Sequence, residues 1–105
     1  MSNNLSVVGR LGKDAELKQV GDNQVLEFSV GSDVGYGDKK STNWFNAGVW
    51  GKSAVALEQY LKKGQQVVVH GELTLRKYIT NEGVEGTSAE IKQCRVDLVG
   101  GKKEQ

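Results

Sequence analysis

The chain has 105 residues, of which 37% are hydrophobic and 26% charged; this composition is typical of one globular domain and excludes a disordered chain. A formal net charge of +1 excludes nucleic-acid binding through bulk charge alone, so such a ligand would need a local basic stripe. The single cysteine, Cys94, excludes an internal disulfide and a thiolate zinc cluster, and without a signal peptide or long apolar run we expect a cytoplasmic protein with no membrane segment.

Three strands are predicted in the first half of the chain, over residues 5–11, 24–33 and 41–50. Each alternates between apolar and polar side chains, the pattern of a strand with one buried face. A short extended segment, residues 16–20, lies between the first two strands and ends at a turn. The loop before the third strand is rich in glycine, contains Tyr36 and ends in two lysines.

One helix and two long strands are predicted in the second half. Residues 52–63 carry a helical stripe of apolar side chains, and Gly64 follows as the expected C-terminal cap. Strands are predicted over residues 66–80 and 87–99, joined by a hairpin loop. The inward positions change parity within the last strand, which predicts a β-bulge near Gln93.

This order of elements predicts an all-β protein with one helix. Long curved strands in the order β-β-β-α-β-β are typical of the OB-fold, a five-stranded Greek-key barrel. Fourteen glycines and no proline fit a strongly bent β-protein. We expect one OB-fold domain over residues 1–101 and a short polar C-terminal tail over residues 102–105.

The inward positions form a complete apolar set, so several aromatic side chains are surplus to the core. In the strand over residues 66–80, the inward set ends with Leu73 and Leu75. Phe28, Phe45 and Tyr60 are also predicted to be core residues. Four other rings fall among polar and basic residues, where they would form a platform for stacking unpaired nucleobases. These candidate stacking residues are Trp44, Trp50, Tyr78 and Tyr36.

Seven cations cluster around the aromatic positions. Each alone would more often be a solvated surface residue, but their distribution predicts contacts with phosphates. Two of them, at the end of the predicted helix, would also complement its dipole. The candidate phosphate-binding residues are Lys52, Arg76, Lys77, Lys39, Lys40, Lys62 and Lys63.

No catalytic or metal-binding set is predicted. His70 has no carboxylate or second histidine at metal-ligand spacing, and Cys94 is predicted to be a small core residue. The scattered carboxylates offer no nucleophile–base pair with an orienting partner. Gly35-Tyr36-Gly37 lacks the third glycine and the following helix of a phosphate-binding loop. We therefore expect no enzyme activity, no metal and no cofactor.

Several motifs follow one another in unbroken order between Asn4 and Gly101. They are NLSVVGRLGKD (residues 4–14), TNWF (42–45), WGK (50–52) leading into YLKKG (60–64), and GEL (71–73) with RKY (76–78). The ordered set resembles the bacterial-type single-stranded DNA-binding protein family.

The resemblance implies that DNA wraps over aromatic side chains on the sheet face and its hairpins, here Trp44, Trp50, Tyr78 and, in a loop of variable length, Tyr36. It also implies a homotetramer, a dimer of dimers, in which the first strand pairs subunits; a homodimer is the other possibility. The outward residues of that strand, the expected subunit interface, are Ser6, Val8 and Arg10.

Two features depart from the family pattern. Ala15 stands where the family usually has proline. Cellular bacterial members carry a long tail with an acidic tip that recruits replication and repair proteins, whereas the sequence given ends at Gln105. We expect a tail-less member, and the recruitment of such partners stays open.

We interpret the chain as a non-enzymatic protein that binds and protects single-stranded DNA, with little sequence preference, in replication, recombination and repair at the nucleoid. One alternative is a primosome-type accessory paralogue that acts mainly as a dimer, although such paralogues typically lose the tryptophans retained here. Another is an OB-fold whose aromatic side chains build a protein interface and bind no DNA.

Overall fold

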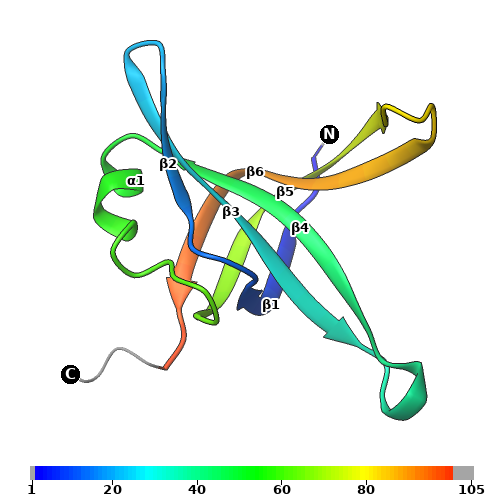
Figure 1. Cartoon of the computed structure of the whole chain (residues 1–105). Helices are drawn as coiled ribbons and strands as arrows, with labels where there is room; N and C mark the ends of the chain where they lie inside the picture. The colour runs from blue at the N-terminus through cyan, green and yellow to red at the C-terminus, as the bar shows by residue number, and fades with distance from the viewer. Residues whose placement is uncertain (1, 101–105) are drawn as a thin grey trace.

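The computed structural model describes residues 2–100, and the expected tail at residues 102–105 lies outside them. Within the described part, the chain forms six strands, a short 3-10 turn and one α-helix (Figure 1). The elements are β1 (Leu5–Leu11), β2 (Glu16–Val20), β3 (Asn23–Val34), η1 (Gly37–Lys39), β4 (Ser41–Trp50), α1 (Lys52–Leu57), β5 (Gln66–Ile79) and β6 (Glu85–Leu98).

Five of the six strands pair in a closed ring, and β2 pairs with one of them. β5 lies between β1 and β6, β6 continues to β4 through a short parallel pairing, and β3 lies between β4 and β2. β1 also pairs with β3, at Arg10↔Gly31 and Leu11↔Val30, so that β1, β5, β6, β4 and β3 form a ring. This confirms the predicted OB-fold, although the strand count was one too low. Residues 16–20 form β2, which pairs with β3 from Glu16↔Glu27 to Val20↔Asn23.

The core lies inside this ring, on the face that the alternating pattern predicted. Outward and inward positions of β1, β3 and β4 differ in exposure as expected, except that Val25, at an outward position of β3 opposite Trp50, is only 3% exposed. Cys94 packs partly buried against the core. The predicted bulge is confirmed, because the register of β5 and β6 shifts between His70 and Glu72 and Gln93 has a φ of 51°. The side chains with no measurable exposure are Leu26, Val30, Ala54, Leu61, Val67 and Val69.

The predicted helix was too long. α1 ends at Leu57, and the chain continues in turns in which the Leu61 N–H donates to the Leu57 carbonyl at 3.1 Å. Leu61 still reaches the core, but Tyr60, predicted to be buried, is 43% exposed. The turns rotate Tyr60 outward while they bury its neighbour.

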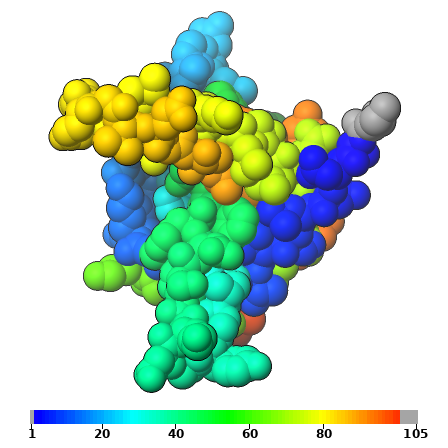
Figure 2. All heavy atoms as spheres, turned by 90° about the vertical axis from the view of Figure 1, so that its right-hand side faces the viewer, coloured from blue at the N-terminus to red at the C-terminus, as the bar shows by residue number. Residues whose placement is uncertain are grey.

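The inward assignment of Leu75 was also wrong, since this side chain is 63% exposed. β5 and β6 stay paired as far as Ile79↔Glu85, beyond the barrel, and project from it as a two-stranded arm. Figure 2 shows this β5–β6 arm in yellow and a second arm, made by β3 and β4, leaving the body in another direction. Leu75 is exposed because the arm extends past the barrel, where no core packs against its inward side.

Replacing a core residue of the β2–β3 hairpin should destabilise the protein far more than replacing an exposed one. Leu26 is 0% exposed and Val20 is 51% exposed. Leu26→Ala should lower the free energy of unfolding by about 2–5 kcal/mol, because it leaves a cavity. Val20→Ala should change it by less than about 0.5 kcal/mol. Urea denaturation measures both values, and equal losses would contradict the assigned core.

Candidate nucleic-acid interface

The outer face of β4 carries two exposed tryptophans. Trp44 and Trp50 are 54% and 52% exposed, which agrees with the parity argument from the sequence. They lie on the same face of one strand, about 20 Å apart at the usual rise per residue. Asn46 and Gly48 occupy the positions between them. The face therefore offers two rings separated by small polar surface.

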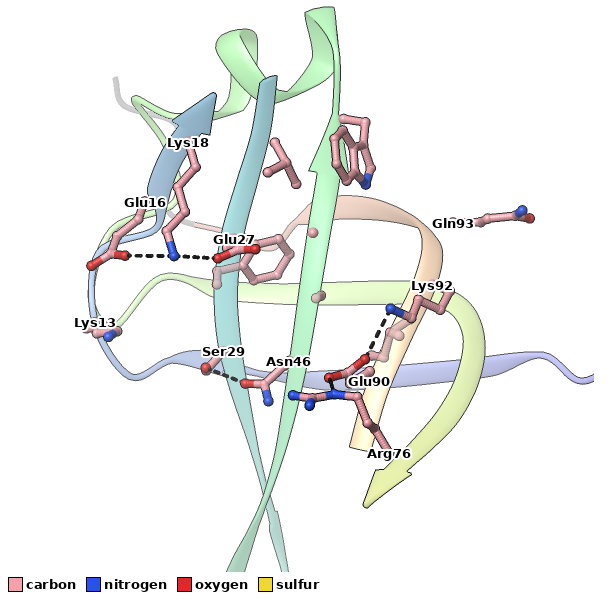
Figure 3. Close-up of a pocket in the computed structure, with 16 residues that line it drawn as sticks. Lys13, Glu16, Lys18, Glu27, Ser29, Asn46, Arg76, Glu90, Lys92 and Gln93 are labelled. Carbon is pink, nitrogen blue, oxygen red and sulfur yellow. Dashed lines mark hydrogen bonds and ion pairs between the residues drawn. The ribbon is translucent and has the colours of Figure 1, made fainter. Parts of the chain in front are cut away.

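A cavity of about 410 Å³ opens beside Trp50, between residues of β2, β3, β4, β5 and β6 (Figure 3). Its lining places Trp50 and Arg76 in one site, although they are far apart in the sequence. Four cations and three carboxylates line it, so the cavity mixes an apolar ring with charge of both signs. The charged residues are Lys13, Lys18, Arg76, Lys92, Glu16, Glu27 and Glu90.

Carboxylates hold the cations of this cavity in place. The Glu90 carboxylate accepts from Arg76 Nε at 2.7 Å and pairs with Lys92 Nζ at 3.1 Å. The hydrogen bond from Arg76, and then that from Lys92, lower the pKa of Glu90, so it is ionised at neutral pH. On the opposite wall, Lys18 Nζ lies 2.8 Å from Glu27, whose hydrogen bond raises the pKa of Lys18.

Neutral hydrogen bonds run through Asn46 on the outer face of β4, and Figure 3 shows the one with Ser29. Ser29 Oγ donates to Asn46 Oδ1 at 2.9 Å, and Asn46 Nδ2 donates to Ser88 Oγ at 2.9 Å. These bonds tie β3, β4 and β6 together and orient the Asn46 amide. Sequence reasoning missed this residue, although its outward position between the tryptophans was a usable signal.

The β5–β6 arm presents Tyr78 and Arg76 on one face. Tyr78 is 43% exposed and pairs across the arm with Gly86, and Arg76 pairs with Ser88. Lys77 lies between them in the sequence and so points to the opposite face. The structure therefore separates Lys77 from the two residues with which it was grouped.

The tip of the β3–β4 arm carries Tyr36, which is 88% exposed. Lys39 and Lys40 follow in and after η1, and Lys40 Nζ lies 3.5 Å from the Asp33 carboxylate. A hydrogen bond from Thr42, and secondarily the charge of Lys40, lower the pKa of Asp33. Tyr36 is thus close in sequence to two cations, but none of these side chains lines the cavity beside Trp50.

The other predicted cations lie around α1. Lys52 is exposed at the start of the helix and lines a second hollow against the β2–β3 turn. Lys62 and Lys63 lie in the connection to β5. The backbone N–H of Lys63 donates a hydrogen bond of 2.8 Å to Asp14 Oδ1, which lies between β1 and β2. Neither lysine lines the cavity, and their role stays a prediction. The cations that sequence reasoning missed are Lys13, Lys18 and Lys92, which come from separate elements.

The predicted subunit face lies on β1. Ser6, Val8 and Arg10 are exposed there, and Val8 is 55% exposed. One edge of β1 pairs with β5 from Leu5 to Arg10, whereas among the described residues the other edge pairs with β3 only at Arg10 and Leu11. Most of that second edge is therefore open for pairing.

A serine–histidine–aspartate chain of hydrogen bonds corrects the expectation that no such set would assemble. Ser6 Oγ lies 2.8 Å from His70 Nδ1, and His70 Nε2 lies 3.2 Å from Asp97 Oδ2. The three residues come from β1, β5 and β6 and meet only through strand pairing. They line neither of the cavities described above. Around His70, β5 pairs with β1 on one side and with β6 on the other.

Two further observations concern residues 2–100. No group of three His, Cys, Asp or Glu side chains in this part of the chain could hold a metal ion. No helix there is long and apolar enough to cross a membrane.

Solved structures share this fold. An SSB from Plasmodium falciparum in complex with single-stranded DNA superposes with a TM-score of 0.75 at 27% identity, covering 93% of this chain and 95% of that one. A small single-stranded DNA-binding protein from Streptomyces coelicolor superposes with a TM-score of 0.72 at 24% identity, covering 95% and 92%.

Relatives that are similar in sequence are also single-stranded DNA-binding proteins. A single-stranded DNA-binding protein of Neisseria meningitidis serogroup A is 32% identical, over 97% of this chain and 62% of its own length. One from Treponema pallidum is 36% identical, over 93% of this chain and 58% of its own. The chain thus spans about three fifths of the length of these relatives. The model of the Single-strand binding protein family matches residues 2–99, and the chain belongs to that family.

Proposed function

We propose that this protein binds and protects single-stranded DNA, with little sequence preference, during replication, recombination and repair. The observation that carries the proposal is the shared cavity of Trp50 and Arg76, on an outer face that also bears Trp44. Every nucleobase has a π-face, so stacking on exposed rings tolerates any sequence. The names of the relatives and the DNA in the Plasmodium falciparum complex support the same conclusion.

In this proposal, bases stack on Trp44, Trp50, Tyr78 and Tyr36 while phosphates meet the nearby cations. Arg76 is the best placed of these, because it shares a cavity with one ring and a strand face with another. Lys92 and Lys18 join it as candidates. A phosphate would compete with Glu90 and Glu27 for these cations, so binding replaces ion pairs already present.

We infer no catalysis from the Ser6–His70–Asp97 chain. Ser6 and Asp97 are exposed on a sheet face, where water competes with any reacting group. The bonds join three adjacent strands, and cross-strand polar contacts of this kind stabilise a sheet.

A DNA-binding role implies a location at the nucleoid, in the cytoplasm.

We propose that four copies assemble through the open edge of β1. Two such edges pairing antiparallel would bury Val8 and satisfy the free backbone groups of both strands. Two of these dimers would form a tetramer. Assembly would also place the rings of several copies on one DNA path and raise the local density of cations above that of a nearly neutral monomer.

Removing either tryptophan should weaken DNA binding without unfolding the protein. Trp44→Ala and Trp50→Ala should each cost roughly 1–3 kcal/mol of binding free energy to oligo-dT, the usual contribution of one base–aromatic stack. Quenching of tryptophan fluorescence and anisotropy of a labelled oligonucleotide measure this. Tyr60→Ala removes an exposed ring away from the face and should leave affinity unchanged. Losses of roughly 3–5 kcal/mol in folding stability with unchanged affinity would instead indicate core tryptophans and a protein-interaction OB-fold.

Binding should depend only moderately on salt, because stacking is insensitive to ions. Each phosphate neutralised on a single strand contributes about −0.7 to the slope of log K against log salt. Titrations between about 50 and 500 mM NaCl should therefore keep measurable affinity for oligo-dT. Complete loss of binding over this range of salt would contradict the proposed stacking of bases.

Sedimentation equilibrium should give a mass about four times the 11.4 kDa of one chain. Val8→Asp should lower this mass, because it places a charge in the proposed strand pairing. Val55→Asp is the matched control, since Val55 is 50% exposed on α1. A wild-type dimer would favour the primosome-type alternative, and a wild-type monomer would exclude pairing through β1.

A further inference from the structure

Three glycines beside the candidate stacking rings have no backbone reason to be glycine. Seven glycines of the described chain have a positive φ, which L side chains rarely adopt, but Gly12, Gly31 and Gly86 are not among them. They lie in or next to regular strands, where glycine weakens the strand. Another constraint must therefore account for them, and close approach of a neighbouring group is the usual one.

The neighbouring group at Gly86 is the ring of Tyr78. The two residues are direct partners across the β5–β6 arm. A methyl group placed on Gly86 would lie 2.5 Å from Tyr78 Oη and 2.8 Å from Cε2. Both distances are well inside the ~3.5–4.0 Å of ordinary contact between heavy atoms. The tyrosine ring thus occupies the space that a side chain at position 86 would need.

Trp44 has the same relation to two glycines. It pairs with Gly31 across β3 and β4, and a methyl group there would lie 2.9 Å from both Cη2 and Cζ3 of the indole. A methyl group on Gly12 would meet the same two atoms at 2.9 Å. One edge of the indole therefore rests against two glycines from different elements.

We infer that Gly86, and Gly31 with Gly12, are positioning residues that hold Tyr78 and Trp44 for base stacking. Each ring is about half exposed, so one side rests on the glycine backbone and the other stays available. A ring held in this way loses little rotational freedom when a base stacks on it. The inference deepens the proposed function and rests on it.

The test compares Gly86→Ala, Tyr78→Ala and the double variant in binding to oligo-dT, by anisotropy of a labelled oligonucleotide. Tyr78→Ala should raise Kd about 5- to 150-fold, the range expected for one stacked base. Gly86→Ala should raise Kd by a comparable factor, because its methyl group displaces the ring. In the Tyr78→Ala background it should add nothing. Thr87→Ala is the control, because Thr87 is exposed at the next position of β6 and so points to the opposite face of the same arm; it should change Kd by no more than about twofold.

A readout without DNA tests the ring position itself. The α-protons of Gly86 should be shifted by the ring current of Tyr78 in NMR spectra of the wild type, and the shift should disappear in Tyr78→Ala. Gly86→Ala should keep the unfolding temperature within a few degrees of the wild type, since alanine suits a strand with ordinary φ better than glycine does.

The outcomes separate this inference from the proposed function. A wild type that does not bind oligo-dT would overturn the proposed function and the inference together. A wild type that binds, and loses affinity with Tyr78→Ala but not with Gly86→Ala, would overturn the inference alone. A loss with Gly86→Ala that persists in the Tyr78→Ala background would also overturn it, since the methyl group would then act on DNA directly.

Discussion

The limited interior of the barrel is the constraint on which the rest of the structure depends. Five strands enclose room for one layer of side chains, and residues such as Leu26, Val30 and Val67 already fill it with no measurable exposure. Side chains alternate along each strand, so the outer positions must face solvent or a partner. The two tryptophans of β4 occupy such positions and are about half exposed.

The charged residues around the cavity beside Trp50 also limit how strongly the protein can attract a ligand. The chain is nearly neutral, yet four cations line the cavity beside Trp50, and carboxylates there pair with three of them, Lys18, Arg76 and Lys92. The Glu90 carboxylate keeps both Arg76 and Lys92 aimed into the site, at a modest electrostatic cost because the cavity is open to water. Such pairs limit attraction to any polyanion and leave discrimination to the rings. In the proposed function, such a surface would select unpaired bases, since a duplex hides the faces of its bases within the stack.

Strands that continue beyond the barrel extend the proposed binding face. β5 and β6 remain paired beyond the core, as do β3 and β4, and each arm carries an exposed tyrosine. The exposure of Leu75 is a consequence of the same extension, because the arm has no second layer. Each arm is held by backbone pairing together with cross-strand side-chain contacts, such as Arg76–Glu90 in one and Thr42–Asp33 in the other.

The sequence by itself determined whatever depends on short-range periodicity. Alternation over ten residues was enough to place Trp44 and Trp50 outside, and a change of parity was enough to find the bulge at Gln93. The order of elements was enough for the fold class. These features are local, because side-chain direction in a strand repeats every second residue.

Only the tertiary structure decided what pairing between distant strands creates. The closure of β1 on β3, the glycines against which Trp44 and Tyr78 rest, the Ser6–His70–Asp97 chain and the grouping of Arg76 with Trp50 all depend on register. The length of α1 was decided in the same way, since burial of Leu61 is achieved by turns rather than by helix. Register between strands that are distant in the chain depends on which strands meet, and the alternation within one strand does not show that.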